Sequence, residues 1–323
     1  MERAARIERT GGPDVIGWHD VELPPPGPGE VRLRHGAVGL NFIDTYHRGG
    51  LYPVKLPSGL GLEAAGTVEA VGDGVAGWRV GDRAGVFAGP PGAYATARNV
   101  AADLLVPVPD GVDDRTAAAI LLKGATAAML VEQCARVRAG QAVLVTAAAG
   151  GVGHLLVGWL KAIGAIVIGT VGMEAKAARV RDAGADHVLL SGEDIARRVR
   201  EITGGEGVSA VLDGVGKATW EAALASTARR GLIVSYGNAS GPVEGVNLGV
   251  LARAGSLFVT RPTLFDYAVT APERRALADR VFAMLARGAI RPEIGQTFAL
   301  EDAADAHRAL EAGRTQGSTV LVP

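Results

Sequence analysis

Residues 143–156 read VLVTAAAGGVGHLL, and this stretch decides the fold class. An apolar run meets three alanines, then Gly150, Gly151 and Gly153, and then a second apolar stretch. Small residues between a strand and a helix let the chain turn tightly and let the backbone approach a pyrophosphate. Ala148-x-Gly150-x-x-Gly153 therefore resembles the dinucleotide-binding fingerprint, with alanine at its first glycine. The alternative is that these glycines only allow tight packing of the helix on the sheet.

Composition limits the classes of partner. The chain has 323 residues, of which 48% are hydrophobic and 21% charged, and it is long enough for two domains. Its 33 Lys and Arg nearly balance 34 Asp and Glu, giving a formal net charge of −1. A nucleic-acid or anionic-membrane partner would need a basic excess, so neither is expected.

Cysteine content and the ends of the chain favour a cytoplasmic protein. The single cysteine, Cys134, excludes an internal disulfide and a cysteine-based zinc cluster. The N-terminal residues lack the apolar centre of a signal peptide, and no apolar run is long enough to be read as a membrane span.

Two kinds of pattern divide the chain. The first 120 or so residues alternate short strands with glycine turns, which favours a small barrel. Residues 114–137 are alanine-rich with helical periodicity, and strands and helices then alternate, which predicts a parallel sheet with helices on both faces. We expect strands at 141–146, 165–171, 187–190, 208–215, 231–236 and 257–261, and helices at 152–163, 174–182, 194–203 and 220–229. In the C-terminal part we expect helices at 272–287 and 303–311 and strands at 295–300 and 318–322.

The end of the second strand of this sheet indicates the cofactor. An acid there usually binds the ribose hydroxyls of NAD, but the strand ends Gly169-Thr170-Val171-Gly172. Lys176 follows one helical turn later and can act as a point charge for a 2′-phosphate, which favours NADPH. The alternative interpretation is that Lys176 is a solvent-exposed helix residue with no part in cofactor binding.

The N-terminal half carries a family resemblance. Residues 39–72, GLNFIDTYHRGGLYPVKLPSGLGLEAAGTVEAVG, together with AAAGGVG at 147–153 and TQGSTVLVP at 315–323, resemble the zinc-free quinone oxidoreductases of the medium-chain dehydrogenase/reductase superfamily. The resemblance implies an α/β protein: a GroES-like, β-rich catalytic domain at 1–122, a doubly wound Rossmann domain binding NADPH at 123–263, and a return to the catalytic domain at 264–323.

No metal is expected. Zinc-dependent alcohol dehydrogenases place a cysteine and histidines at positions where this chain has Asn41, Leu62 and Lys123. An apolar and a cationic side chain are poor zinc ligands. The histidines also show no metal-ligand spacing; they are His19, His35, His47, His154, His187 and His307.

Catalytic candidates come from the same signature. Asn41 can donate a hydrogen bond through its amide, Tyr46 can donate through its hydroxyl, and Tyr52 is placed at the substrate cleft. The alternatives are a cofactor contact for Tyr46 and simple packing for Tyr52. Asp44 and Glu63 are expected to be structural, with Glu63 ordering the signature loops.

The expected cofactor contacts extend over both domains. Geometry assigns the pyrophosphate to the turn at Gly150–Gly153. Ser191 aligns where relatives often carry a tyrosine beside the 2′-phosphate, and Arg314 lies near an arginine that helps in relatives. The resemblance adds Phe42, Ile43, Asp44, Thr45, Tyr46, Met129, Gly151, Val152, Gly172, Lys176, Gly216, Asn238, Ala239, Ser240, Gly241, Thr263, Leu264 and Phe265.

These features together favour hydride transfer from NADPH to a small quinone. A zinc-free reductase of α,β-unsaturated ketones or aldehydes is the nearest alternative, and a non-enzymatic crystallin-like cofactor- or RNA-binding protein is an alternative of another class. Residues 255–261, GSLFVTR, form an apolar last strand, which predicts a homodimer through this edge. The alternative is that helix 272–287 covers the edge.

Overall fold

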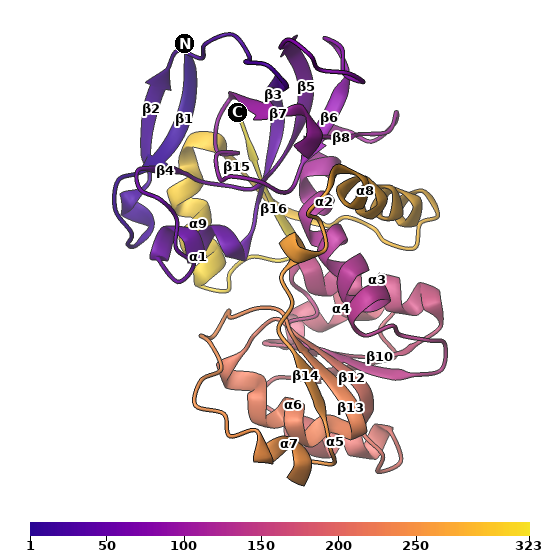
Figure 1. Cartoon of the computed structure of the whole chain (residues 1–323). Helices are drawn as coiled ribbons and strands as arrows, with labels where there is room; N and C mark the ends of the chain where they lie inside the picture. The colour runs from indigo at the N-terminus through magenta and orange to yellow at the C-terminus, as the bar shows by residue number, and fades with distance from the viewer. The chain divides into compact units, whose positions relative to one another are not determined.

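The computed structural model describes residues 1–323, which form two compact units (Figure 1). Unit 1 contains Met1–Lys123, Ala268–Asp279 and Pro292–Pro323. Unit 2 contains Gly124–Tyr267 and Arg280–Arg291.

Unit 1 is built on a mostly antiparallel seven-stranded sheet. Its strand order is β15-β16-β3-β5-β6-β8, with β7 pairing β3, and a three-stranded sheet has the order β2-β1-β4. The apolar core between these strands includes Ile7, Leu33, Leu60, Val86 and Tyr94. The strands are β1 (Glu2–Ile7), β2 (Gly17–Val21), β3 (Glu30–Leu40), β4 (Ser58–Gly59), β5 (Glu63–Val71), β6 (Arg83–Val86), β7 (Ala97–Ala101), β8 (Val106–Pro107), β15 (Ile294–Ala299) and β16 (Ser318–Val322).

Four helices serve unit 1. Helix α1 (Phe42–Gly49) follows β3 directly, and α9 (Ala303–Glu311) lies between β15 and β16. Helix α2 (Asp114–Ala128) begins in unit 1 and continues into unit 2, and α8 (Ala271–Ala286) does the same. Strand β16 pairs β3, which joins the C-terminus to the sheet that carries α1.

Unit 2 is a doubly wound parallel sheet. Its strand order is β11-β10-β9-β12-β13-β14, so the order reverses between β9 and β12. The strands are β9 (Ala142–Val145), β10 (Ile166–Val171), β11 (His187–Leu190), β12 (Val208–Asp213), β13 (Thr227–Ser235) and β14 (Phe258–Thr260). In open α/β sheets, ligands bind outside the carboxyl ends of the strands at such a reversal.

Helices cover both faces of this sheet (Figure 1). Helices α3 (Gly151–Ile163) and α4 (Ala177–Asp182) lie on one face, while α5 (Ile195–Ile202) and α6 (Trp220–Ser226) lie on the other. Helix α7 (Gly249–Arg253) precedes β14. An apolar cluster that includes Val199, Leu224 and Ile233 joins α5 and α6 to the strands.

Two expected elements have different bounds. The helix expected over 114–137 is α2 followed by a π-helical turn, η3 (Met129–Cys134), whose wider turns place Met129 and Leu130 in the core. The helix expected to reach residue 229 ends at Ser226, because the Thr227 hydroxyl bonds to the Ala223 carbonyl and β13 starts there.

The C-terminal part does not belong wholly to the first domain, contrary to the expected division. Within the range 264–323, both residues 264–267 and Arg280–Arg291 belong to unit 2. The reason is close packing on small residues. A Cβ atom on Gly124 would lie 2.8 Å from the Val281 side chain, and one on Gly158 would lie 2.6 Å from the Ala289 carbonyl oxygen.

One helical segment meets the length and composition of a membrane span, contrary to the expectation from the sequence. The segment Asp114–Cys134 has 21 residues and contains an 18-residue window with a mean hydropathy of 1.3. Of this window, 78% is buried inside the structure. Burial of this extent is typical of a helix in a protein core.

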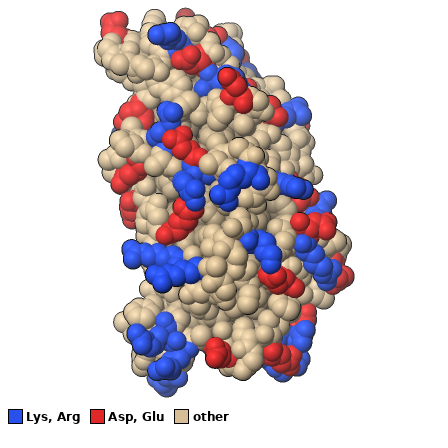
Figure 2. Space-filling view, turned by 90° about the vertical axis from the view of Figure 1, so that its right-hand side faces the viewer, with Lys and Arg blue, Asp and Glu red and all other residues tan.

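Charges of both signs are mixed on the surface. Figure 2 shows Lys and Arg side chains beside Asp and Glu side chains over most of the face that it presents. Exposed ion pairs include Arg34–Glu69 and Arg197–Glu201. Such exposed pairs contribute little to stability, about 0–1 kcal/mol each.

Replacing Gly153 tests the strand–turn–helix geometry. A Cβ atom on Gly153 would lie 2.3 Å from the Ala147 carbonyl oxygen, so Gly153→Ala forces the turn open. We expect a free energy of unfolding lower by about 1–3 kcal/mol, measured by urea denaturation. Gly172→Ala is the control, since its Cβ would meet nothing within 4 Å. Equal stability of both variants and the unaltered chain would contradict the packing argument.

Candidate functional site

The glycine-rich turn of unit 2 lies between β9 and α3. Gly150 has extended backbone and precedes the first residue of α3, Gly151. Ala147 has a positive φ of 48°, and its carbonyl accepts a hydrogen bond from the Gly150 N–H at 2.9 Å. The first-turn N–H groups of α3 have no acceptor within the helix, so this turn can bind an anion.

Asp213, at the end of β12, fixes the neighbouring loops. Its carboxylate accepts hydrogen bonds from the hydroxyls of Thr146 and Thr219, at 2.7 and 2.8 Å. It also accepts from the backbone N–H groups of Val215 and Gly216. This buried acid was not singled out from the sequence. Thr146 follows β9 directly, so its hydrogen bond to Asp213 holds the carboxyl ends of β9 and β12 together at the sheet's reversal point.

A cavity of about 360 Å³ opens beside this point. Leu144, Thr146, Thr170, Ser191 and Thr219 are among the residues that line it. They come from the ends of β9 and β10, from the residue after β11 and from the start of α6. The cavity therefore lies where the doubly wound topology places a nucleotide.

The end of β10 carries the residues expected to choose between NADH and NADPH. Open space surrounds the Cα of Gly172, and Lys176 ends a 3-10 turn, η4 (Glu174–Lys176), with its side chain half-buried. The Ser191 hydroxyl donates to the Val171 carbonyl at 3.1 Å, so it serves to join β11 to β10. No acidic side chain stands on the turn after β10 before Glu174.

Two further predicted segments meet at the same edge of unit 2. Gly216 has a positive φ of 90°, and a Cβ there would lie 2.6 Å from the Gly241 carbonyl oxygen. The segment Asn238–Gly241 is tied to residues 214–217 by backbone hydrogen bonds. Met129 is buried at the start of η3, and Thr263–Phe265 lie at the start of η6 (Leu264–Asp266).

In unit 1, the start of α1 presents the predicted catalytic residues. Asn41 precedes the helix, and the Asp44 carboxylate accepts a hydrogen bond from the Asn41 backbone N–H at 2.9 Å. Such a bond satisfies one of the donors at a helix N-terminus. The Asn41 side chain points elsewhere: its Nδ2 donates to Glu63 at 2.8 Å and to the Gly39 carbonyl at 3.3 Å.

Glu63 is the centre of this half of the site. Its fully buried carboxylate accepts from the Asn41 amide, from the Leu122 backbone N–H at 2.7 Å and from the Lys123 ammonium at 2.9 Å. Glu63 begins β5, and Lys123 lies on α2. One carboxylate thus joins β5, the start of α1 and α2, as expected for a residue that orders the signature.

These residues do not fit a zinc site. Leu62 has no donor atom, the Lys123 ammonium is paired with Glu63, and the Asn41 amide nitrogen donates to the same carboxylate. No group of three or more His, Cys, Asp or Glu side chains is arranged to hold a metal ion.

Aromatic rings line the exposed side of α1. The Tyr46 and Tyr52 rings meet edge to face with centroids 5.2 Å apart, and the centroids of the Phe42 and Tyr46 rings are 6.2 Å apart. Phe42 is 37% exposed, and Ile43 is half-buried. Thr45 bonds back to the Phe42 carbonyl. Of the other predicted residues of unit 1, Arg314 is exposed in the loop before β16.

Sequence reasoning missed three buried polar residues behind α1. Tyr94 donates to Asp44, His307 contacts Tyr94, and Arg48 contacts His307. His307 and Tyr94 are 213 residues apart, so local pattern could not join them. The one local signal was the spacing of Asp44 and Arg48, which places two polar residues on one face of α1.

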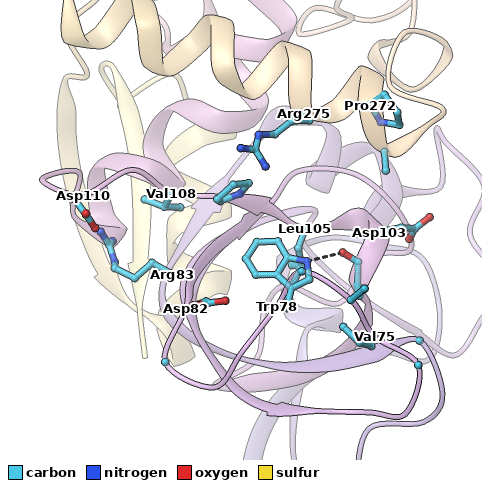
Figure 3. A pocket seen from close by; sticks show the side chains of 18 residues that line it. Val75, Trp78, Asp82, Arg83, Asp103, Leu105, Val108, Asp110, Pro272 and Arg275 are labelled. Atoms are coloured by element: carbon cyan, nitrogen blue, oxygen red, sulfur yellow. Dashed lines mark hydrogen bonds between the residues drawn. The ribbon is translucent and has the colours of Figure 1, made fainter.

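A separate cavity of about 1020 Å³ is lined by residues of unit 1, including Trp78, Leu105, Val108, Pro272 and Arg275 (Figure 3). The Trp78 indole donates to the Ala102 carbonyl at 3.2 Å. None of the predicted catalytic or cofactor-binding residues lines it.

Comparisons with known proteins give the family context. Residues 27–110 match the alcohol dehydrogenase GroES-like domain, and residues 151–283 match a domain described as zinc-binding dehydrogenase. The chain is 51% identical to a quinone oxidoreductase of Pseudomonas aeruginosa, with both chains covered completely. It is 42% identical to a 2-haloacrylate reductase of a Burkholderia species, over 100% of this chain and 99% of that protein. The structure of Escherichia coli quinone oxidoreductase complexed with NADPH matches with a TM-score of 0.97 at 43% identity, covering 99% of this chain and 100% of that one.

Proposed function

Because the chain belongs to the quinone oxidoreductase family and is an oxidoreductase, we propose that it reduces a quinone with NADPH and without a metal ion. The observation that carries this proposal is the Glu63 carboxylate with its three donors. It fixes an amide and an ammonium group in the region where a metal would otherwise be held.

The residues of unit 2 fit a dinucleotide. Gly153 lets α3 approach β9 closely, and the open side of the Gly150–Gly153 turn presents backbone N–H groups to a pyrophosphate. The cavity of about 360 Å³ between the strand ends fits the adenosine part. Bound NADPH supplies the hydride.

In unit 1, the Tyr46 hydroxyl donates to the substrate carbonyl, and the Tyr46 ring is held against Tyr52. Asn41 shapes the site from behind, because its amide nitrogen already donates to Glu63 and to the Gly39 carbonyl. A quinone is electron-poor, and its reduced anion is delocalised over the ring, so orientation and a few hydrogen-bond donors suffice. Oxidation of an alcohol would instead require stabilisation of a localised alkoxide, usually by a metal ion, and these residues do not form a metal site.

Parallel assays test the proposal. We expect the chain to oxidise NADPH with a small quinone, and to show no activity with NADP⁺ and a saturated alcohol. Asn41→Ala and Tyr46→Phe each lower turnover about tenfold, which is less than loss of a donor to a localised oxyanion costs. Alcohol oxidation without quinone reduction would contradict the proposal. Unchanged turnover in both variants would show that other residues orient the substrate.

Reduction of an activated alkene is the second candidate. The observation that favours it is the full-length similarity to a 2-haloacrylate reductase. Addition of hydride to an α,β-unsaturated carbonyl compound also produces a delocalised anion, an enolate, so the same donors serve. An enone included in the assays above separates the two, since the preferred substrate has the higher kcat/KM.

We propose that Lys176 recognises the 2′-phosphate of NADPH. A hydrogen bond to a charged group contributes about 1.5–3 kcal/mol, or roughly 10–150-fold in affinity. Lys176→Ala should raise the dissociation constant for NADPH by about this factor and leave that for NADH nearly unchanged, as measured by nicotinamide fluorescence. Lys161→Ala is the control, because Lys161 lies in the last turn of α3 and pairs with Asp186. If Lys176→Ala loses affinity for NADPH and NADH equally, this role is contradicted.

We also propose that the chain forms a homodimer in the cytoplasm. β14 is the last strand of its sheet, pairing β13, and its Phe258 and Val259 side chains are 60% and 40% exposed. An exposed apolar edge invites pairing with a second copy. Light scattering should give twice the mass of one chain, and Phe258→Asp should lower it to the monomer value. A monomeric unaltered chain would contradict this contact.

A further inference from the structure

A continuous set of buried hydrogen bonds runs behind α1 through Arg48, His307, Tyr94 and Asp44, and we name it the buried chain. Tyr94 Oη lies 3.0 Å from Asp44 Oδ2 and 2.9 Å from His307 Nε2. His307 Nδ1 lies 2.9 Å from Arg48 Nη1. Arg48 also pairs with Glu311 at the end of α9. The buried chain therefore links α1 to α9 through Tyr94, which lies in the segment between β6 and β7.

The donors of the buried chain all point toward Asp44. Arginine only donates, so His307 Nδ1 accepts from Arg48 and the proton of the neutral ring is on Nε2. His307 Nε2–H then donates to Tyr94, whose hydroxyl proton is directed at Asp44. Burial and the neighbouring Arg48 lower the pKa of His307 to about 3, which keeps the ring neutral. Burial also raises the pKa of the Tyr94 hydroxyl, so it stays a donor.

Asp44 is the one acid at which this set of bonds ends. It is fully buried, its Oδ2 accepts from Tyr94 and from the Asn41 backbone, and its Oδ1 has no partner. Burial raises its pKa to about 7, while the two hydrogen bonds and Lys123 on α2 oppose the rise and Glu63 on β5 adds to it. At the other end of this set of bonds, Arg48 of α1 pairs with Glu311 of α9.

We propose that Tyr94 and His307 are positioning residues for the catalytic half of the site. Their hydrogen bonds favour the ionised form of the Asp44 carboxyl group, and the carboxylate holds the Asn41 backbone and the first turn of α1 in place. A protonated Asp44 is a weaker acceptor and its own proton has no acceptor at Oδ1, so the start of α1 loosens. The residues that orient the quinone thus depend on side chains that never contact it.

This inference rests on the proposed quinone reduction, and its test has a readout that does not. The pH dependence of kcat/KM for quinone reduction is measured for the unaltered chain, for Tyr94→Phe and for Asp44→Asn. We expect activity to rise with pH through about 7 as Asp44 ionises. In Tyr94→Phe, the pH at which activity rises should be higher by about one to two units, while the plateau at high pH stays nearly unchanged. Asp44→Asn should abolish the rise.

Infrared absorption of a protonated carboxylic acid, titrated against pH, reports Asp44 without any substrate. The signal should be lost near neutral pH in the unaltered chain, at higher pH in Tyr94→Phe, and be absent in Asp44→Asn. His307→Gln retains a donor to Tyr94 and should stay close to the unaltered chain, whereas His307→Leu should shift both profiles upward. Ser318→Ala removes another buried hydroxyl, which donates to the Ala119 carbonyl, and controls for lost stability.

The outcomes separate the two claims. Failure of the unaltered chain to reduce quinones would overturn the proposed function, while the infrared titration still tests the buried chain. A uniform loss of activity in Tyr94→Phe at every pH, with an unshifted infrared titration, would show a purely structural role and overturn the inference. Unchanged profiles in both Tyr94→Phe and His307→Leu would overturn it too.

Discussion

The buried carboxylate of Glu63 is the constraint on which the catalytic half of this protein depends. A buried charge is costly unless it is paired, and Glu63 has the Lys123 ammonium, the Leu122 N–H and the Asn41 amide as donors. Removing one partner of such a pair costs about 3–5 kcal/mol, because the other charge is left buried. The same contacts that make the burial tolerable also join α1 and α2 to β5.

In unit 2, the corresponding constraint is the close packing of backbone segments at glycines. Gly153 packs against the Ala147 carbonyl, and Gly216 packs against the Gly241 carbonyl, at distances that leave no room for a side chain. Asp213 accepts four hydrogen bonds: one from Thr146 ties the ends of β9 and β12 together, and three from residues 215, 216 and 219 fix the loop after β12. The Gly150–Gly153 turn is shaped by sterics and hydrogen bonds, so the groups that it offers to an anion are backbone N–H groups, which no substitution of a charged side chain removes.

Much of this architecture could be predicted from local pattern. The alternation after residue 140 predicted the doubly wound sheet, and the alanine-glycine turn predicted its nucleotide edge. The family resemblance predicted the β-rich first domain and a structural Glu63 that orders the signature, whereas the role of Asn41 stays a prediction. Local pattern could not predict that α8 belongs partly to unit 2, because this depends on Gly124 and Gly158 meeting residues 130 or more positions away. It also could not predict the contacts of Asp44, Tyr94 and His307, because these residues lie far apart in the sequence and meet through the pairing of β16 with β3.

The central claim is that hydrogen-bond donors held by Glu63 and the start of α1 do the work that a bound metal does in other dehydrogenases. Its most direct test is single-turnover reduction of a small quinone by chain stripped of metal with a chelator, with zinc content measured on the same sample. The account predicts one NADPH oxidised for each quinone reduced, at the same rate before and after stripping. A rate that is lost with the metal and returns when one zinc ion per chain is restored would contradict it.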